Sequence, residues 1–323
     1  MIKKIILYAL PVLTILFYSC KEDFSPYGDY HENYAFTCIL KSDMNSQVAF
    51  LSHSYRPSSV DPYENEDDPL ITNADVRVWY NDSVFVFRDT SVVRTDSSRY
   101  QTPLHFYYND QFRVTNKKSI ELEVLLPNGK RLKSSSVTPG EIFFDDRSEV
   151  IIPPVGKSTI QFIWKPLDES TLFANRMTIR YKQNVNGSVV EKTKDVPVRY
   201  VVSNGEDVPY FPKPNNSATV VYDLAAVTKA LEEISAGDPD KQNYSIYPKV
   251  GFDLIAFDHP ASQYVSSISG SVDDLTVSVS ASDYTNIEGG YGIFGSYIRK
   301  DYERLKFLES YIKSFGYNFI NEN

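Results

Sequence analysis

The fold class is decided by one stretch, Ile71-Thr-Asn-Ala-Asp-Val-Arg-Val-Trp-Tyr-Asn-Asp-Ser-Val-Phe-Val-Phe87. Val76, Val78 and Tyr80 recur at every second position, which is the period of a strand with one buried face. Asn81-Asp-Ser83 interrupts this pattern, and a second apolar run follows it. Two such runs around a short polar turn are typical of a β-hairpin, so the stretch predicts a mainly β protein.

The same alternation continues on both sides of this hairpin. Asn128-Gly129 and Asn186-Gly187 each separate two strand-like runs, and Asn-Gly is a strong hairpin signal. The other expected strands are Phe36–Leu40, Val48–Ser52, Glu121–Leu126, Arg131–Ser134, Ile151–Pro154, Ile160–Trp164, Met177–Tyr181, Val189–Val190, Val196–Val202, Val250–Phe257, Leu275–Val279 and Tyr291–Phe294.

Two short helices are expected in the C-terminal half. Asp223 can cap a helix over about 223–236 that ends at Gly237, and Asp301 can cap one over about 301–315 that ends at Gly316. We expect tandem β-sandwich domains over 34–146 and 147–323. The Trp-Lys-Pro strand end, the following Tyr-bearing strand and the Asn-Gly turn indicate an immunoglobulin- or fibronectin III-like second domain. The alternative is a separate third domain after about residue 215.

The first twenty residues have the pattern of an export leader. Lys3 and Lys4 precede an apolar stretch that is too short to span a bilayer and ends at Ser19-Cys20. A cysteine directly behind such a stretch resembles a lipobox, although Phe17 and Tyr18 stand where Leu and a small residue are usual. We expect residues 1–19 to be a lipoprotein signal peptide and residues 20–33 to be the lipidated cysteine and a tether.

Lipid attached to Cys20 would anchor the chain to a membrane, because several acyl chains together give stable binding. Lys21, Glu22 and Asp23 follow directly and resemble the surface-export signal of Bacteroidota lipoproteins. The expected location is therefore the outer membrane, lipid-anchored and exposed at the cell surface. The alternatives are an uncleaved anchor helix and a soluble secreted form.

Charge and cysteine content exclude several classes of function. The net charge is −9, and removing the two leader lysines makes the mature chain more acidic, which argues against nucleic acid as a partner. With Cys20 lipidated, Cys38 has no disulfide partner, and its apolar surroundings predict a buried thiol or, alternatively, a reactive one. The four histidines have no metal-ligand spacing, and no catalytic motif appears, so we expect no cofactor and no enzyme, with a hydrolase as the alternative.

Two surface features are candidate ligand sites. The segment 61–68 concentrates five carboxylates, which could hold Ca²⁺ or form a solvated acidic loop: Asp61, Glu64, Glu66, Asp67 and Asp68. Aromatic residues at Tyr107, Tyr108, Tyr291 and Phe294 could contact a partner or stack on a ligand, or could belong to the core. The glycines around Tyr291 and Phe294 suit a bulged strand or a close backbone approach.

Several of these motifs together resemble one family. They are the lipobox, Ile71–Val78, the Leu-Pro-Asn-Gly strand that leads into Ser-Ser-Val-Thr-Pro139, Ile160–Pro166 and Asn286–Gly295. The set is similar to Bacteroidota outer-membrane lipoproteins grouped as domain of unknown function 4249 (DUF4249). The resemblance implies a transthyretin-like or carboxypeptidase-regulatory-like first domain and a genetic association with TonB-dependent receptors. No catalytic residues are established for that family, so none are transferred.

The expected function is that of a non-catalytic surface lipoprotein that acts as an accessory binding subunit beside a TonB-dependent transporter. The alternatives are a stand-alone glycan- or peptide-binding lipoprotein, an adhesin and an envelope structural protein.

Lipidation of Cys20 is directly testable. Cells that express the protein and are fed an alkyne analogue of palmitate should label the wild-type chain, and the Cys20→Ala variant should lose the label. The Cys38→Ala variant is the control and should label normally. An intact leader or an unmodified Cys20 thiol in the mass spectrum of the mature protein would contradict the prediction.

Overall fold

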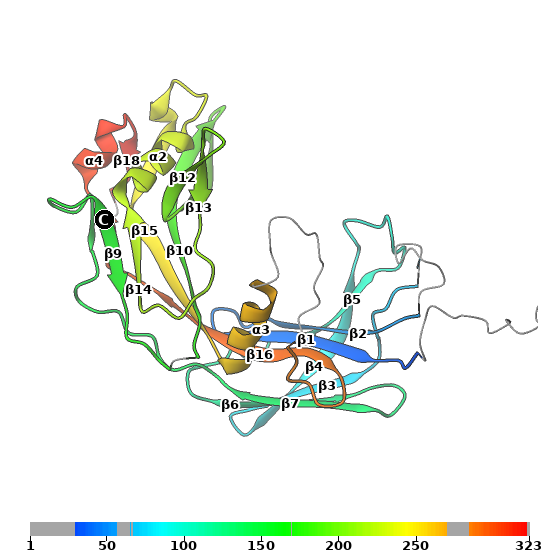
Figure 1. Cartoon of the computed structure of the whole chain (residues 1–323). Helices are drawn as coiled ribbons and strands as arrows, with labels where there is room; N and C mark the ends of the chain where they lie inside the picture. Colours follow the sequence, from blue (N-terminus) through cyan, green and yellow to red (C-terminus); the bar gives the residue numbers. More distant parts are fainter. Residues whose placement is uncertain (1–29, 57–64, 66, 169, 270–283, 322–323) are drawn as a thin grey trace, which may run out of the picture. The chain divides into compact units, whose positions relative to one another are not determined.

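Strands dominate the computed structural model, which describes residues 30–56, 65, 67–168, 170–269 and 284–321 (Figure 1). The prediction of a mainly β protein with sandwich-like packing is therefore confirmed. The first seven strands are β1 (Tyr34–Lys41), β2 (Gln47–His53), β3 (Asp75–Tyr80), β4 (Ser83–Val92), β5 (Leu104–Asn109), β6 (Ser119–Leu125) and β7 (Arg131–Val137).

The hairpin that predicted the fold also organises this part of the chain. The first half of β4 pairs with β3, from Ser83 to Phe87, and its second half pairs with β5, from Arg88 to Val92. One long strand thus belongs to two sheets. Their inward side chains meet in a shared core that includes Phe36, Val78 and Leu122, all at most 2% exposed.

The described residues after β7 add eleven strands, three α-helices and one short 3-10 helix. The strands are β8 (Ile151–Ile152), β9 (Thr159–Ile163), β10 (Phe173–Val185), β11 (Ser188–Val196), β12 (Arg199–Ser203), β13 (Glu206–Tyr210), β14 (Thr219–Asp223), β15 (Tyr244–Phe257), β16 (Tyr291–Asp301), β17 (Lys306–Phe307) and β18 (Asn318–Phe319). The helices are α2 (Leu224–Ile234), η2 (Lys241–Asn243), α3 (His259–Ser269) and α4 (Glu309–Ser314).

A second aromatic core forms where the pair β9–β14 packs on β15. The rings of Phe162 and Phe252 stack with centroids 3.7 Å apart, and Tyr222 and Tyr302 meet them edge-on. Offset or edge-on aromatic packing adds to the free energy that burial of the rings already provides. Trp164 contributes to the same core at 3% exposure.

Strand β16 joins the two halves of the chain. Tyr291–Tyr297 pairs in parallel with Ala35–Lys41 of β1, and Tyr297–Asp301 pairs with Asp253–Phe257 of β15. Figure 1 shows the orange β16 running beside the blue β1. A sheet path of strands therefore runs from β11 through β15, β16 and β1 to β7.

The glycine-rich motif makes this junction sterically feasible. Gly292 lies opposite Phe36 with φ of +108°, and a Cβ atom placed on it would overlap the Phe36 carbonyl oxygen. Gly290 approaches the Tyr34 carbonyl oxygen in the same way, 2.7 Å from an added Cβ. The close backbone approach that the sequence suggested is what these two glycines provide.

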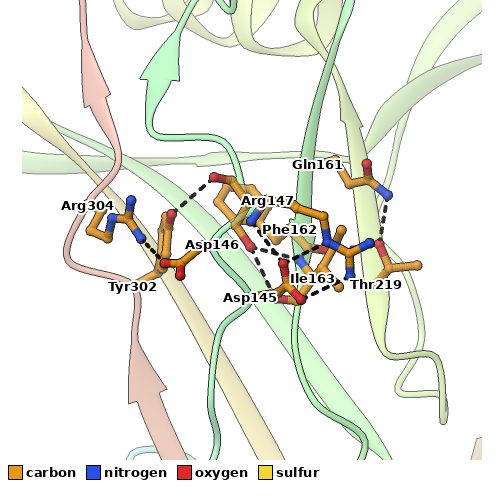
Figure 2. A network of polar contacts seen from close by, with 10 residues as sticks. Asp145, Asp146, Arg147, Gln161, Phe162, Ile163, Thr219, Tyr302 and Arg304 are labelled. Carbon is orange, nitrogen blue, oxygen red and sulfur yellow. Dashed lines mark hydrogen bonds and ion pairs between the residues drawn. The ribbon is translucent and has the colours of Figure 1, made fainter.

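The segment between β7 and β8 is fastened to the second core by polar contacts (Figure 2). Ser148 Oγ donates to Ile163 O and accepts from Ile163 N, while Tyr302 donates to Ser148 O. Arg304 pairs with Asp146 at 2.8 Å. These contacts satisfy buried backbone groups and hold the connection against β9, so they have a structural role.

The expected helix over 301–315 is wrong in its first half. Asp301 ends β16 instead of capping a helix, and α4 begins only at Glu309 after Leu308. The reason is tertiary pairing, because Leu305 is fully buried and its carbonyl accepts from Val250 N. The helix expected over 223–236 is present as α2.

Helix α3 was not expected from the sequence, and two further expectations are not tested. The expected strand Leu275–Val279 lies outside the described residues. The boundary near residue 146 stays a prediction, although segments from both sides of it pair through β1 and β16. Within the described residues, no helix is long and apolar enough to cross a membrane.

The junction predicts a steep cost for a methyl group at Gly292. Gly292→Ala should lower the free energy of unfolding in urea by at least about 3 kcal/mol, because backbone strain is combined with a clash that only strand separation relieves. Gly187→Ala is the matched control: its φ is +84° but an added Cβ meets nothing within 4 Å, so it should cost only about 1–2 kcal/mol. Equal losses in the two variants would contradict this account of the junction.

Candidate functional site

Two of the four aromatic candidates are core residues, which corrects the expectation that they could contact a ligand. Tyr107 is 1% exposed, and its hydroxyl donates to Ile71 O at 2.8 Å and accepts from Ala74 N. Burial raises the pKa of Tyr107 to about 12. Phe294 is fully buried opposite Cys38 in the β1–β16 pair. Side chains without exposed surface cannot stack on a ligand.

The other two aromatic candidates are accessible but belong to different strands. Tyr108 on β5 is partly exposed beneath the Arg88 guanidinium, 5.8 Å from its ring centroid. Tyr291 on β16 is 56% exposed. Strands β2 and β1 lie between β5 and β16 in the sheet, so this pair does not form one assembled aromatic surface.

The acidic loop is only partly described. Asp61, Glu64 and Glu66 lie outside the described residues, as do Cys20 and Lys21, Glu22 and Asp23. Asp67 is exposed, whereas Asp68 accepts from Arg94 at 2.5 Å and from Thr102 at 2.6 Å. Partial burial opposes ionisation of Asp68, but these hydrogen bonds and the Arg94 charge lower its pKa overall. Asp68 is thus engaged by a protein cation, and calcium binding remains a prediction.

The groups most often used in nucleophilic catalysis have other surroundings here. Cys38 is fully buried, and desolvation raises its pKa to about 12, which keeps the thiol protonated and unreactive. His105 Nδ1 lies 3.3 Å from Asp89 Oδ1, and neither side chain is bonded to a serine or cysteine side chain among the described residues. No group of three potential metal-ligating side chains occurs in that part of the chain either.

A large hollow of about 990 Å³ lies where β7, the following segment and the start of α3 meet. This volume is at the upper end of the range of ligand sites, about 300–1,000 Å³. Its walls come from four places in the sequence: Asn116–Lys117 with Ser119 and Glu121, Ser135–Glu141 with Phe143, Lys165–Asp168 with Thr171, and Phe257–Pro260. Hydroxyl groups, charged side chains and prolines therefore surround one open space.

Asp258 is the buried acid of this hollow, with 2% exposure. Its Oδ1 accepts from Ala261 N at 2.9 Å, and its Oδ2 accepts from both Ser136 Oγ and Ser296 Oγ at 2.8 Å. The carboxylate thus caps α3 while it connects that helix to β7 and β16. Helix N-termini favour such a side chain because their first N–H groups have no partner within the helix.

Burial controls the ionisation of Asp258. Desolvation raises its pKa to about 6, and the hydrogen bonds from Ala261, Ser136 and Ser296 limit the rise. Both carboxylate oxygens are committed to these contacts, and the serines donate to the acid instead of to a histidine. The arrangement orders one wall of the hollow.

Sequence reasoning missed this cluster, although a signal was present. Asp258 is followed by Pro260 in the sequence Asp-His-Pro, and an N-cap residue with proline in the first turn is typical of a helix start. The two serines could not be found in this way because they lie 122 and 38 residues away in the chain.

No family model matches the chain, and no curated protein matches it.

The raised pKa of Asp258 predicts a definite dependence of stability on pH. Between pH 3.8 and about 6, Asp258 is protonated in the folded state but ionised in the unfolded chain. The free energy of unfolding is therefore highest at low pH and falls as the pH rises through 6, where the folded protein must bury the charged carboxylate. Compared with Asp258→Asn, the free energy of unfolding of the wild type should therefore decrease by on the order of 2–3 kcal/mol as the pH rises across this window.

Asp68→Asn is the control of opposite sign. The pKa of Asp68 is lowered, so the wild type should lose stability relative to that variant as pH falls. Urea unfolding of the three proteins at a series of pH values measures both effects. A difference between wild type and Asp258→Asn that is constant with pH would show that Asp258 has an ordinary pKa.

Proposed function

We propose that this chain is a non-catalytic lipoprotein of the outer-membrane surface whose β-rich part binds a ligand or partner. The export leader and the Ser19-Cys20 junction support the location. The acids and lysine after Cys20 support display at the surface, and the acidic charge of the chain means that lipid, not electrostatic attraction to anionic headgroups, would hold it there.

The hydrogen bonding of the buried Asp258 carboxylate is the main support for proposing a binding function instead of catalysis. Asp258 supplies the buried carboxyl group in the hollow of about 990 Å³, and its two oxygens receive three hydrogen bonds that cap α3 and connect β7 with β16. A general acid or base has to exchange a proton with a substrate, and this carboxyl group is turned into the fold instead. The hollow itself has the size and the mixed lining of a ligand site.

We further propose that the protein works beside a TonB-dependent receptor as an accessory subunit. This part rests on the resemblance of its motifs to the DUF4249 lipoproteins. The stand-alone alternative, in which the lipoprotein binds its ligand without a transporter, predicts the same hollow but no stable partner.

Affinity purification tests the association. The tagged wild-type protein, extracted from outer membranes in mild detergent, should bring down a TonB-dependent receptor in reproducible amounts. Cys20→Ala, which should not reach the outer membrane, is the control and should bring down none. Repeated recovery of the wild-type lipoprotein alone would contradict the accessory role and favour the stand-alone one.

Protease treatment of intact cells tests the side of the membrane. A surface protein should be digested while a periplasmic marker in the same cells stays intact. Protection of the lipoprotein until the outer membrane is permeabilised would place it on the inner side and contradict surface display.

A further inference from the structure

An unusual tryptophan lies on the solvent-facing side of β3, β6 and β7. The strand register places Trp79 of β3 opposite Glu121 of β6, and Glu121 opposite Ser135 of β7. The neighbours of Trp79 along its own strand, Val78 and Tyr80, are buried in the core. Because side chains alternate across a strand, Trp79 points to the opposite, outer face.

The surroundings of Trp79 differ from those of the only other tryptophan. Trp164 is 3% exposed and packs edge-on against Phe173, with centroids 5.5 Å apart. Trp79 is partly exposed, and among the described residues its ring has no aromatic or cation–π partner. Large aromatic side chains at the surface commonly serve as rigid contact residues, with an apolar ring face and a polar N–H.

Trp79 borders two of three adjoining hollows. One of about 490 Å³ is bounded by Trp79, Glu121, Lys133, Ser135 and Glu288 among others. Glu121 and Ser135 also line the hollow of about 990 Å³, and Trp79 and Glu121 line a third of about 390 Å³. Glu121 lines all three hollows, which therefore adjoin one another around its side chain, and we refer to the three together as the trough.

Polar groups without protein partners surround the ring. Within the described chain, the side chains of Glu121, Lys133 and Glu288 form no hydrogen bond or ion pair. Nearby charges on the same sheet are paired, since Arg131 contacts Glu123 at 2.9 Å. The unpaired carboxylates and the ammonium group can therefore accept from and donate to a ligand without first breaking an internal contact.

The outer edge of β7 adds backbone groups to the trough. Lys133 N donates to Glu288 O at 3.1 Å, and Lys133 O accepts from Glu288 N at 2.8 Å, so the backbone N–H and C=O groups of Lys133 point away from β6. By strand alternation, the N–H and C=O groups of Ser135 and Val137 point the same way. They have no backbone partner among the described residues.

We propose that this trough binds a chain of sugar units, with Trp79 as the stacking platform. This inference rests on the proposed binding function and names its ligand class. A pyranose ring offers an apolar C–H face to an indole ring, and its hydroxyl groups both donate and accept, as the carboxylates, the ammonium group and the β7 edge require. An extended peptide could also pair with the β7 edge, but the hollow directly around Trp79 is lined mainly by polar groups, which favours a sugar as the group that contacts the indole ring.

Tryptophan fluorescence gives a specific test, because the chain has two tryptophans. In a Trp164→Phe background, Trp79 is the only emitter, and stacking of a sugar excludes water from it. Titration with hexaoses of glucose, xylose and mannose should give a saturable shift of emission to shorter wavelength with at least one of them.

Calorimetry on the otherwise wild-type protein makes the test independent of that background. Trp79→Ala should weaken binding of the same hexaose at least about tenfold, which corresponds to ~1.4 kcal/mol. Tyr210→Ala, which removes a 41% exposed aromatic residue on β13 that lines none of the three hollows, is the matched control and should bind normally.

Two results would overturn the proposal. One is that none of the hexaoses changes the emission or produces heat. The other is that unstructured peptides bind, that Val137→Pro, which removes an outward N–H, abolishes this binding, and that Trp79→Ala leaves it unchanged. Neither result bears on receptor association, because Trp79→Ala should still purify with the receptor. Failure of this inference is therefore distinguishable from failure of the proposed function.

Discussion

The parallel pairing of β1 with β16 is the constraint on which the other features of this protein depend. It brings a strand from near the C-terminus against the first strand of the β-rich part, and the approach is close enough that Gly292 must face the Phe36 carbonyl without a side chain. Parallel pairing between segments so distant in the chain carries a high entropic cost of loop closure. Burial of Phe36, Cys38 and Phe294 along the pair offsets that cost.

The position of the hollow of about 990 Å³ follows from this pairing. Once β16 lies beside β1, Ser296 comes within reach of Asp258, and the same carboxylate contacts Ser136 of β7 and caps α3. The beginning of α3 then forms one wall, and β7 forms another. A single buried acid thus fixes the position of the hollow, and the hollow beside Trp79 adjoins it through Glu121 and Ser135.

Local patterns in the sequence were sufficient for much of the fold. The alternation in Ile71–Phe87 predicted β3 and β4, and the Asn-Gly turns predicted the hairpins β6–β7 and β10–β11. The pairing of β1 with β16 could not be predicted because it depends on contacts between distant segments. The glycines around Tyr291 and Phe294 indicated a close backbone approach but not the strand that is approached. The same kind of contact explains the error at Asp301, where pairing of Leu305 with β15 prevented the expected helix. For the candidate site, alternation placed Trp79 on the outer face, but it did not distinguish Tyr108, which is accessible, from Tyr107, which is buried.

Hydrogen–deuterium exchange on the intact protein tests the β1–β16 junction most directly. If this pairing holds the two halves together, the amides of Ala35–Lys41 and Tyr291–Tyr297 should be protected to the same degree and should lose protection together as urea is added. Rapid exchange across β16 while β1 remains protected would contradict the account, because it would show that β1 keeps its structure without the strand assigned to it.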